Sequence, residues 1–204
     1  MKIVKYIKLS SGKYKVLFDN KKELILYEKV IIDTNLLYKK EITSEEYNNL
    51  VSLNNYHDIY NKAIKYIEIR LRSKKEIINY LNKMNLSTEV IDDILNKLID
   101  NYYIDDERFS KAYINDKYNF SNNGPYKIIN ELVKLGINKD TAYTYTFDII
   151  TNEEEKINKL INKYIKSDRK HDWYYLRNKI YNNLINLGYS KEIVLSILNN
   201  YNYV

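Results

Sequence analysis

Side chains that could support catalysis are few and scattered in this chain. His57 and His171 are the only histidines and cysteine is absent, which excludes a Cys–His nucleophile and any Cys-based zinc site. The sequence contains no GxxxxGK[ST], GxGxxG or GxSxG motif. The acidic runs 105–107 and 153–155 precede helix-like patterns, so we expect them to open helices, with Asp105 or Asp106 as a cap. We therefore predict no enzymatic activity, no metal and no cofactor.

The basic residues offer a different chemistry, the binding of anions. The net charge is +6, which permits a nucleic-acid partner without requiring one. The 23 tyrosines are assigned to core and boundary positions. Arginine is rare beside lysine, so the few arginines mark places where a planar fork of donors matters. Four cations crowd into residues 70–75, where a bound anion would relieve their repulsion. The candidate contact residues are Arg70, Arg72, Lys74, Lys75, Arg108, Lys111, Lys127 and Arg177.

An internal repeat must position these cations. Residues 78–91, 129–142 and 181–194 align with the same apolar stripe, and Leu81, Leu132 and Leu184 correspond. Each segment predicts a helix that ends in a left-handed residue, followed by a capped helix. The predicted helix ends are Asn85, Gly136 and Gly188, and the predicted caps are Ser87, Asn138 and Ser190.

The fold predicted from this grammar is mainly α, with three tandem three-helix, helix-turn-helix-like repeats forming an elongated curved array. Residues 1–55 form a small N-terminal module, a β-meander plus short helices, and Thr43 with Glu46 offers a capping box. The repeats are expected at residues 56–105, 106–151 and 152–204. Such arrays expose a long surface, which suits an extended macromolecular partner.

Further local signals refine the repeats. Ser73 with Glu76 predicts a capping box, Pro125 a first helical position, and Asp172 an N-cap. In the first helix of the second repeat we expect Arg108, Lys111 and Lys117 on the outer face. The apolar stripe opposite them is predicted to be Phe109, Ala112, Tyr113 and Phe120.

No segment suggests a membrane protein. No window approaches the roughly 18 apolar residues of a membrane span, and the N-terminus lacks the apolar stretch of a signal peptide. We expect a cytoplasmic monomer.

Three stretches resemble the RecX family, the bacterial regulators of the RecA recombinase. Residues 70–81 resemble the family's R-x-R-S-x-x-E-L helix opening, with Leu71 where proline is frequent and Ile77 where leucine is. Residues 103–113 resemble its YLDDERFA…Y signature, and residues 124–137 its G-P-x-x-I-x-x-E-L-x-x-x-G-I pattern. The resemblance covers residues 56–204, and residues 1–55 are similar to the extra module of longer members.

The resemblance implies a non-enzymatic modulator, an inhibitor, that acts in homologous recombination, DNA repair and the SOS response. It implies binding to the filament of RecA on single-stranded DNA, with reduced ATP hydrolysis and strand exchange. Arg70, Arg72 and Arg108 fall in the family motifs, and changing Arg70 and Arg72 to Glu is expected to abolish inhibition without unfolding the protein. Two alternatives stay open, a stand-alone helix-turn-helix DNA-binding protein and a protein-only adaptor. The acidic or neutral character of residues 88–99 and 139–150 argues against groove reading.

Overall fold

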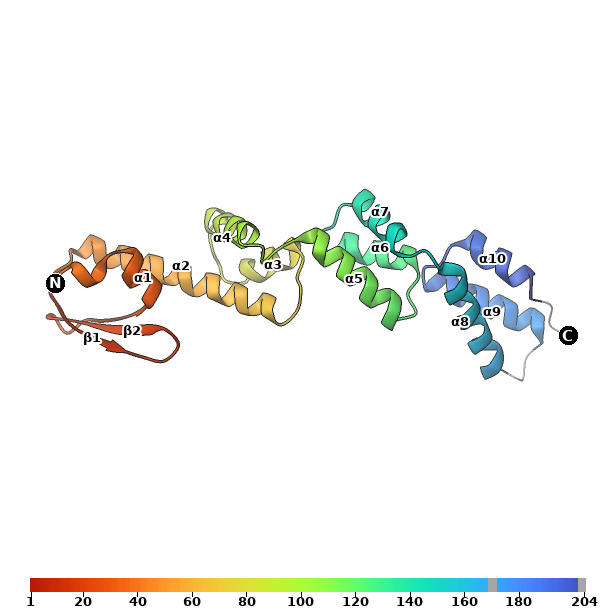
Figure 1. Ribbon diagram of the computed structural model, residues 1–204, viewed down its shortest axis with the longest axis horizontal. Coiled ribbons are helices and arrows are strands. Elements are labelled where there is room, and N and C mark those ends of the chain that lie inside the picture. The colour runs from red at the N-terminus through yellow and green to blue at the C-terminus, as the bar shows by residue number, and fades with distance from the viewer. Residues whose placement is uncertain (169–171, 202–204) are drawn as a thin grey trace. The chain divides into compact units, whose positions relative to one another are not determined.

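Helices make up most of the chain and a small sheet lies near its N-terminus (Figure 1). The computed structural model describes residues 1–168 and 172–201, so Arg169 and His171 lie outside the described residues. The chain divides into two compact units. The first unit comprises residues 1–70 and 80–98, and the second comprises residues 71–79 and the chain from Ile99 onward.

The N-terminal sheet confirms the predicted meander. Its three antiparallel strands run in the order β1 (Ile3–Lys8), β2 (Lys13–Phe18) and β3 (Glu23–Tyr27). Val16 pairs with Tyr6 on one side and with Leu24 on the other. The inner face of the sheet buries apolar side chains against α1 (Glu28–Asp33), η1 (Leu36–Tyr38) and the start of α2 (Ser44–Glu68). This shared core supplies the burial that three strands alone would lack.

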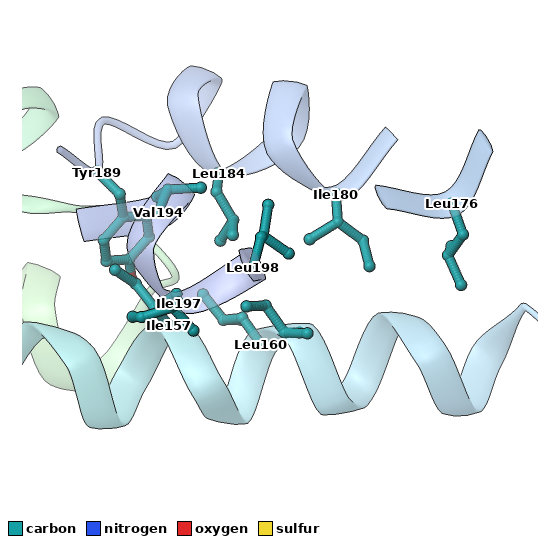
Figure 2. Close-up of a cluster of buried hydrophobic side chains, with 10 residues drawn as sticks. Ile157, Leu160, Leu176, Ile180, Leu184, Tyr189, Val194, Ile197 and Leu198 are labelled. Atoms are coloured by element: carbon teal, nitrogen blue, oxygen red, sulfur yellow. The ribbon is translucent and has the colours of Figure 1, made fainter. Parts of the chain in front are cut away.

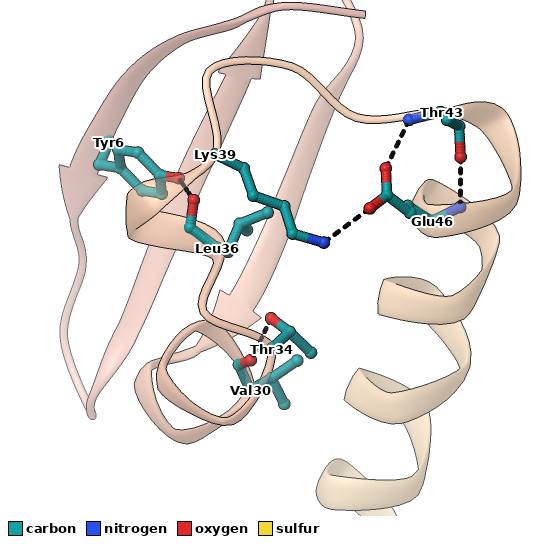
Figure 3. Close-up of polar contacts among 7 residues, drawn as sticks. All are labelled: Tyr6, Val30, Thr34, Leu36, Lys39, Thr43 and Glu46. Carbon is teal, nitrogen blue, oxygen red and sulfur yellow. Dashed lines mark hydrogen bonds and ion pairs between the residues drawn. The ribbon is translucent and has the colours of Figure 1, made fainter.

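The start of α2 is fixed by the predicted capping box. Thr43 Oγ accepts from the Glu46 amide at 3.1 Å, and the Glu46 carboxylate accepts from the Thr43 amide at 2.8 Å (Figure 3). Lys39 reaches the same carboxylate at 2.6 Å, and this hydrogen bond lowers the pKa of Glu46. The hydroxyl of Tyr6 donates to the carbonyl of Leu36 at 3.1 Å, which ties the sheet to η1.

Helix α2 is continuous through the expected boundary between residues 55 and 56. Its middle turns hold the last strand: the Tyr27 amide donates to Asn54 Oδ1 at 2.9 Å and the Tyr27 hydroxyl to Asp58 at 2.6 Å. The His57 ring meets the Tyr27 ring edge-on at 4.8 Å between centroids. Burial lowers the pKa of His57, as do Lys29 and Lys97. His57 is therefore a packed residue of the first unit.

The remaining helices follow the predicted pattern of three helices in each repeat. Each repeat's second helix ends in a left-handed residue, with φ of 53° at Asn85, 97° at Gly136 and 87° at Gly188. The first repeat's last two helices are α3 (Lys74–Asn82) and α4 (Thr88–Asp100). The later helices are α5 (Asp106–Phe120), α6 (Pro125–Lys134), α7 (Lys139–Ile149), α8 (Glu153–Ser167), α9 (Trp173–Asn186) and α10 (Lys191–Asn199).

The second and third repeats each enclose their own core. The second core packs Ile128 and Leu132 of α6 against Phe109, which was predicted to face inward, and Figure 2 shows the α8–α10 core with Leu184 and Val194. The predicted stripe of α5 was wrong at two positions, because Ala112 is exposed and Phe120 is 87% exposed. Buried Ser110 and Ile114 occupy the inner face instead, and the Ser110 hydroxyl donates a hydrogen bond to the Asp106 carbonyl at 2.6 Å. A short polar residue can thus occupy a core position that an apolar pattern misses.

Within the described residues, no helix has both the length and the apolar character that crossing a membrane requires.

Candidate functional site

The three motif segments meet in one place in the second unit, at the N-terminus of α3. Ser73 is fully buried and forms the predicted capping box with Glu76, whose carboxylate accepts from the Ser73 amide at 3.2 Å. The Ser73 hydroxyl also donates to the carbonyl of Leu135 at 2.7 Å, 62 residues along the chain. One serine therefore both caps its own helix and docks it on the end of α6.

The paired acids of the second motif serve two different helices. Of the two predicted caps it is Asp105 that caps α5, by accepting from the Arg108 amide at 2.9 Å, and the helix begins at Asp106. Asp106 Oδ1 accepts from the amide of Lys74 at 2.8 Å, which caps α3 from outside. The segment from 105 to 108 thus binds the start of α3 and the start of α5 together.

Gly136 completes this contact, which we call the first joint. A Cβ on Gly136 would lie 2.6 Å from Lys75 Cβ, closer than two such carbons can approach, and φ is +97°. Lys75 crosses the glycine and its Nζ donates to the Lys134 carbonyl at 3.0 Å. The glycine is required for the close approach as well as for the backbone conformation.

A second joint repeats the arrangement between the start of α6 and the end of α9. The Gly124 amide donates to the Leu187 carbonyl at 2.7 Å, and the Tyr126 amide to the Gly188 carbonyl at 3.0 Å. A Cβ on Gly188 would lie 2.5 Å from the backbone nitrogen of Lys127. Asn85 occupies the corresponding helix end in the first repeat, where the residue is exposed and a side chain fits.

Sequence reasoning missed both joints. It treated Asn85, Gly136 and Gly188 alike, as residues that tolerate a left-handed conformation. The usable signal was the difference between Asn at the first position and Gly at the other two.

Several predicted contact residues are held by bonds within the chain. Arg72 pairs with Glu76 at 3.4 Å, and their side chains are only 11% and 14% exposed. Arg108 donates to the Tyr102 carbonyl at 2.9 Å, Lys111 pairs with Glu107 at 2.7 Å, and Arg177 donates to Asn199 at 2.7 Å. Each of these four cations therefore has a partner within the chain, and only the Arg72 pair is nearly buried.

Three of the four remaining candidates are exposed. Arg70, in the first unit, and Lys74 and Lys75, at the first joint, are exposed. Lys127, at the second joint, is half-buried and lines a shallow cavity of about 470 Å³ together with Tyr126 and Lys191. The second unit therefore brings Lys74 and Lys75 beside the helix of Arg108 and Lys111, while Lys127 lies at the other joint.

Between repeats two and three, Lys156 is used internally. Its Nζ donates to the carbonyls of Ser121, at 2.9 Å, and Tyr118, and it lies 3.9 Å from the centre of the Tyr118 ring. Burial lowers the pKa of Lys156. Glu153, three residues earlier, accepts from the buried Ser190 amide at 3.1 Å, and burial raises the pKa of this carboxyl.

Across the described ranges, no group of three His, Asp or Glu side chains lies close enough to hold a metal ion. What the geometry offers is an array of cations on joined helices, a chemistry of anion contact.

Models of known protein families match the helices that form the first and second repeats. The model of "RecX, first three-helix domain" matches residues 60–98, and that of "RecX, second three-helix domain" matches residues 105–143. Regulatory protein RecX of Finegoldia magna is 29% identical over 192 residues, covering 91% of this chain and 92% of that protein. Regulatory protein RecX of Listeria welshimeri is 31% identical over 182 residues, covering 89% and 68%.

Solved structures resemble the fold. One crystal structure of a regulatory protein RecX aligns over 98% of this chain and 99% of that one, with a TM-score of 0.80 at 21% identity. The crystal structure of RecX from Lactobacillus salivarius aligns over 72% and 96%, with a TM-score of 0.66 at 28% identity.

Proposed function

Because this chain belongs to the RecX family, we propose that it is a non-enzymatic cytoplasmic regulator of RecA. In this proposal the protein binds the filament of RecA on single-stranded DNA as a monomer. Binding slows the filament's ATP hydrolysis and strand exchange. The family membership supports a regulatory role, and inhibition is the specific form that we propose.

The observation that carries the proposal is the first joint, where all three family motifs meet beneath exposed Lys74 and Lys75. The joint holds the N-terminus of α3 against the second repeat. The second joint holds the second repeat against the third. The helices that carry these cations are thereby held together, which suits an extended partner whose phosphates or acidic groups recur along its length.

The test is ATP hydrolysis by the cognate RecA on single-stranded DNA, titrated with this protein below one copy per RecA. Inhibition at such ratios supports filament binding. Absence of any effect from the folded protein contradicts the proposal. Direct DNA binding without an effect on RecA would favour the stand-alone DNA-binding alternative, and a RecA effect insensitive to salt would favour a protein-only contact.

The choice of variant follows from the joint. Arg72→Glu would place a carboxylate beside Glu76 in a nearly buried pair, so the double change Arg70→Glu with Arg72→Glu is expected to disturb the fold. Arg70→Glu with Lys74→Glu reverses two exposed charges instead. The matched control is Lys5→Glu with Lys8→Glu, two exposed positions on β1. The proposal predicts loss of inhibition for the first pair and retention for the control.

A further inference from the structure

A row of lysines on α8 belongs to none of the contacts described so far. Lys159, Lys163 and Lys166 are exposed and follow one another at i, i+4 and i+7, which places them on one face of the helix. The opposite face carries the buried Ile157 and Ile161 of the third core. At 1.5 Å of rise per residue the row extends about 10.5 Å along the helix.

The row lines a shallow hollow that contains no acid. The hollow has a volume of about 520 Å³, and its other lining residues are Asn162 and Ser167, which supply neutral hydrogen-bonding groups. Lys159 pairs with Glu155 at 2.5 Å, whereas Lys163 and Lys166 form no ion pair with a described residue. Like charges three and four residues apart destabilise a helix, so the row is unfavourable for the free protein.

The three-helix fold does not require these lysines. The inner faces of α5 and α8 align with an offset of 47 residues, which superposes Ser110 on Ile157 and Ile114 on Ile161, all of them buried. With the same offset the row corresponds to exposed residues of α5 that carry no positive charge. Those residues are Ala112, Asp116 and Asn119.

We propose that the α8 lysine row, Lys159, Lys163 and Lys166, binds the phosphate backbone of single-stranded DNA directly. The choice of this polyanion rests on the proposed function. The composition of the hollow favours nucleic acid over an acidic protein surface, because protein interfaces are depleted in lysine and enriched in aromatic residues and arginine. The hollow has lysines, an amide and a hydroxyl, and no aromatic residue or arginine. Ammonium groups on flexible stems suit phosphates whose positions vary along a single strand.

The experiment measures binding of the full chain to fluorescently labelled oligo(dT), without RecA, by anisotropy over a range of salt concentrations. The row variant carries Lys159→Gln, Lys163→Gln and Lys166→Gln. A control variant removes the same charge from exposed positions of the N-terminal module, with Lys5→Gln, Lys8→Gln and Lys40→Gln. Far-UV circular dichroism verifies that both variants keep the helical content of the parent.

The expected change follows from counterion release. Each phosphate contact to a single strand contributes about 0.7 to the slope of log K against log salt, so three lost contacts reduce the slope by about 2. Affinity of the row variant should be about 100-fold weaker at 0.1 M salt and converge on the parent near 1 M. The control variant should bind within about threefold of the parent, since general attraction is screened beyond about 10 Å.

Three outcomes overturn the proposal: a parent protein that does not bind oligo(dT), a row variant that binds as the parent does, or equal losses in row and control variants. Measuring RecA ATP hydrolysis with the same proteins separates this proposal from the previous one. A row variant that binds DNA normally but no longer affects RecA would assign the row to a protein contact and overturn the DNA assignment. A parent that binds DNA through the row without affecting RecA would leave this proposal standing while the RecA proposal fails.

Discussion

Replacing Gly188 with alanine should break the second joint. At a φ of +87°, a residue with a Cβ costs about 1–2 kcal/mol. The new methyl would also lie 2.5 Å from the backbone nitrogen of Lys127, which is main chain and cannot rotate away. Relief requires the start of α6 to move, and both backbone hydrogen bonds of the joint depend on its present position.

The cost can be estimated from these parts. Gly124 is buried, and an unsatisfied buried donor or acceptor costs about 1–3 kcal/mol. Losing one such bond in addition to the backbone strain gives about 2–5 kcal/mol for Gly188→Ala. Asn85→Ala is the control, since it introduces a similar left-handed alanine at an exposed helix end, and should cost no more than about 2 kcal/mol. Gly188→Asn separates the two causes, because asparagine tolerates the backbone angle but still carries the Cβ.

The assay is urea unfolding followed by far-UV circular dichroism and by fluorescence of Trp173, the only tryptophan, which lies on α9. Gly188→Ala should lower the free energy of unfolding reported by Trp173 by more than Asn85→Ala does, and Gly188→Asn should lower it by about 1–3 kcal/mol, the cost of the lost bond alone. If Gly188→Asn is as stable as the parent, the close approach is not needed. The glycine would then be explained by its backbone angle alone.

Three further predictions address the first joint and the first unit. Asp105→Ala and Asp106→Ala should each lower the free energy of unfolding by about 1 kcal/mol, because the two acids cap different helices. The double variant should show the sum of the two losses, and a clearly smaller loss would contradict separate roles. Because the pKa of His57 is lowered in the folded state, its contribution to stability is full above the ordinary pKa of 6.5 and is lost as pH falls below that value. His57→Gln should therefore flatten the decline in urea midpoint between pH 7.5 and 5.5. An unchanged decline would assign the pH dependence to other groups. Arg72→Met should destabilise the fold by about 3 kcal/mol while the folded fraction still inhibits RecA. Lys74→Gln should weaken inhibition and leave the stability unchanged. The reverse pattern would make Arg72 the contact.

Local features of the fold were predictable because their physics is local. The Thr43 and Ser73 capping boxes, the Asp172 cap and Pro125 at the start of α6 each depend on residues within about four positions of one another. The repeat itself was readable from the spacing of apolar residues. Each of these signals survives in any tertiary context that leaves the helix intact.

The features that sequence reasoning missed depend on distant partners. The residues near Asn54 give no local sign that α2 continues, because the partner of this part of the helix is Tyr27, on the preceding strand. Phe120 was placed inward by its apolarity, yet it is the last residue of α5 and its side chain is exposed. The bond from Ser73 to Leu135 joins residues that no local pattern relates. Burial and long-range pairing decide these positions, and neither is encoded in spacing.

The joints also change what a family motif means here. Arg72, Ser73, Asp105, Asp106 and Arg108 each form a hydrogen bond or ion pair within the chain, and together these bonds fix where α3 and α5 begin. A side chain committed in this way loses an internal bond if it turns to an outside partner, which opposes its use as a contact. The motifs therefore identify how three-helix sets are joined. Recognition is better sought in exposed side chains that the joints leave unused, as Lys74 is within the first motif and the α8 lysines are beyond the motifs.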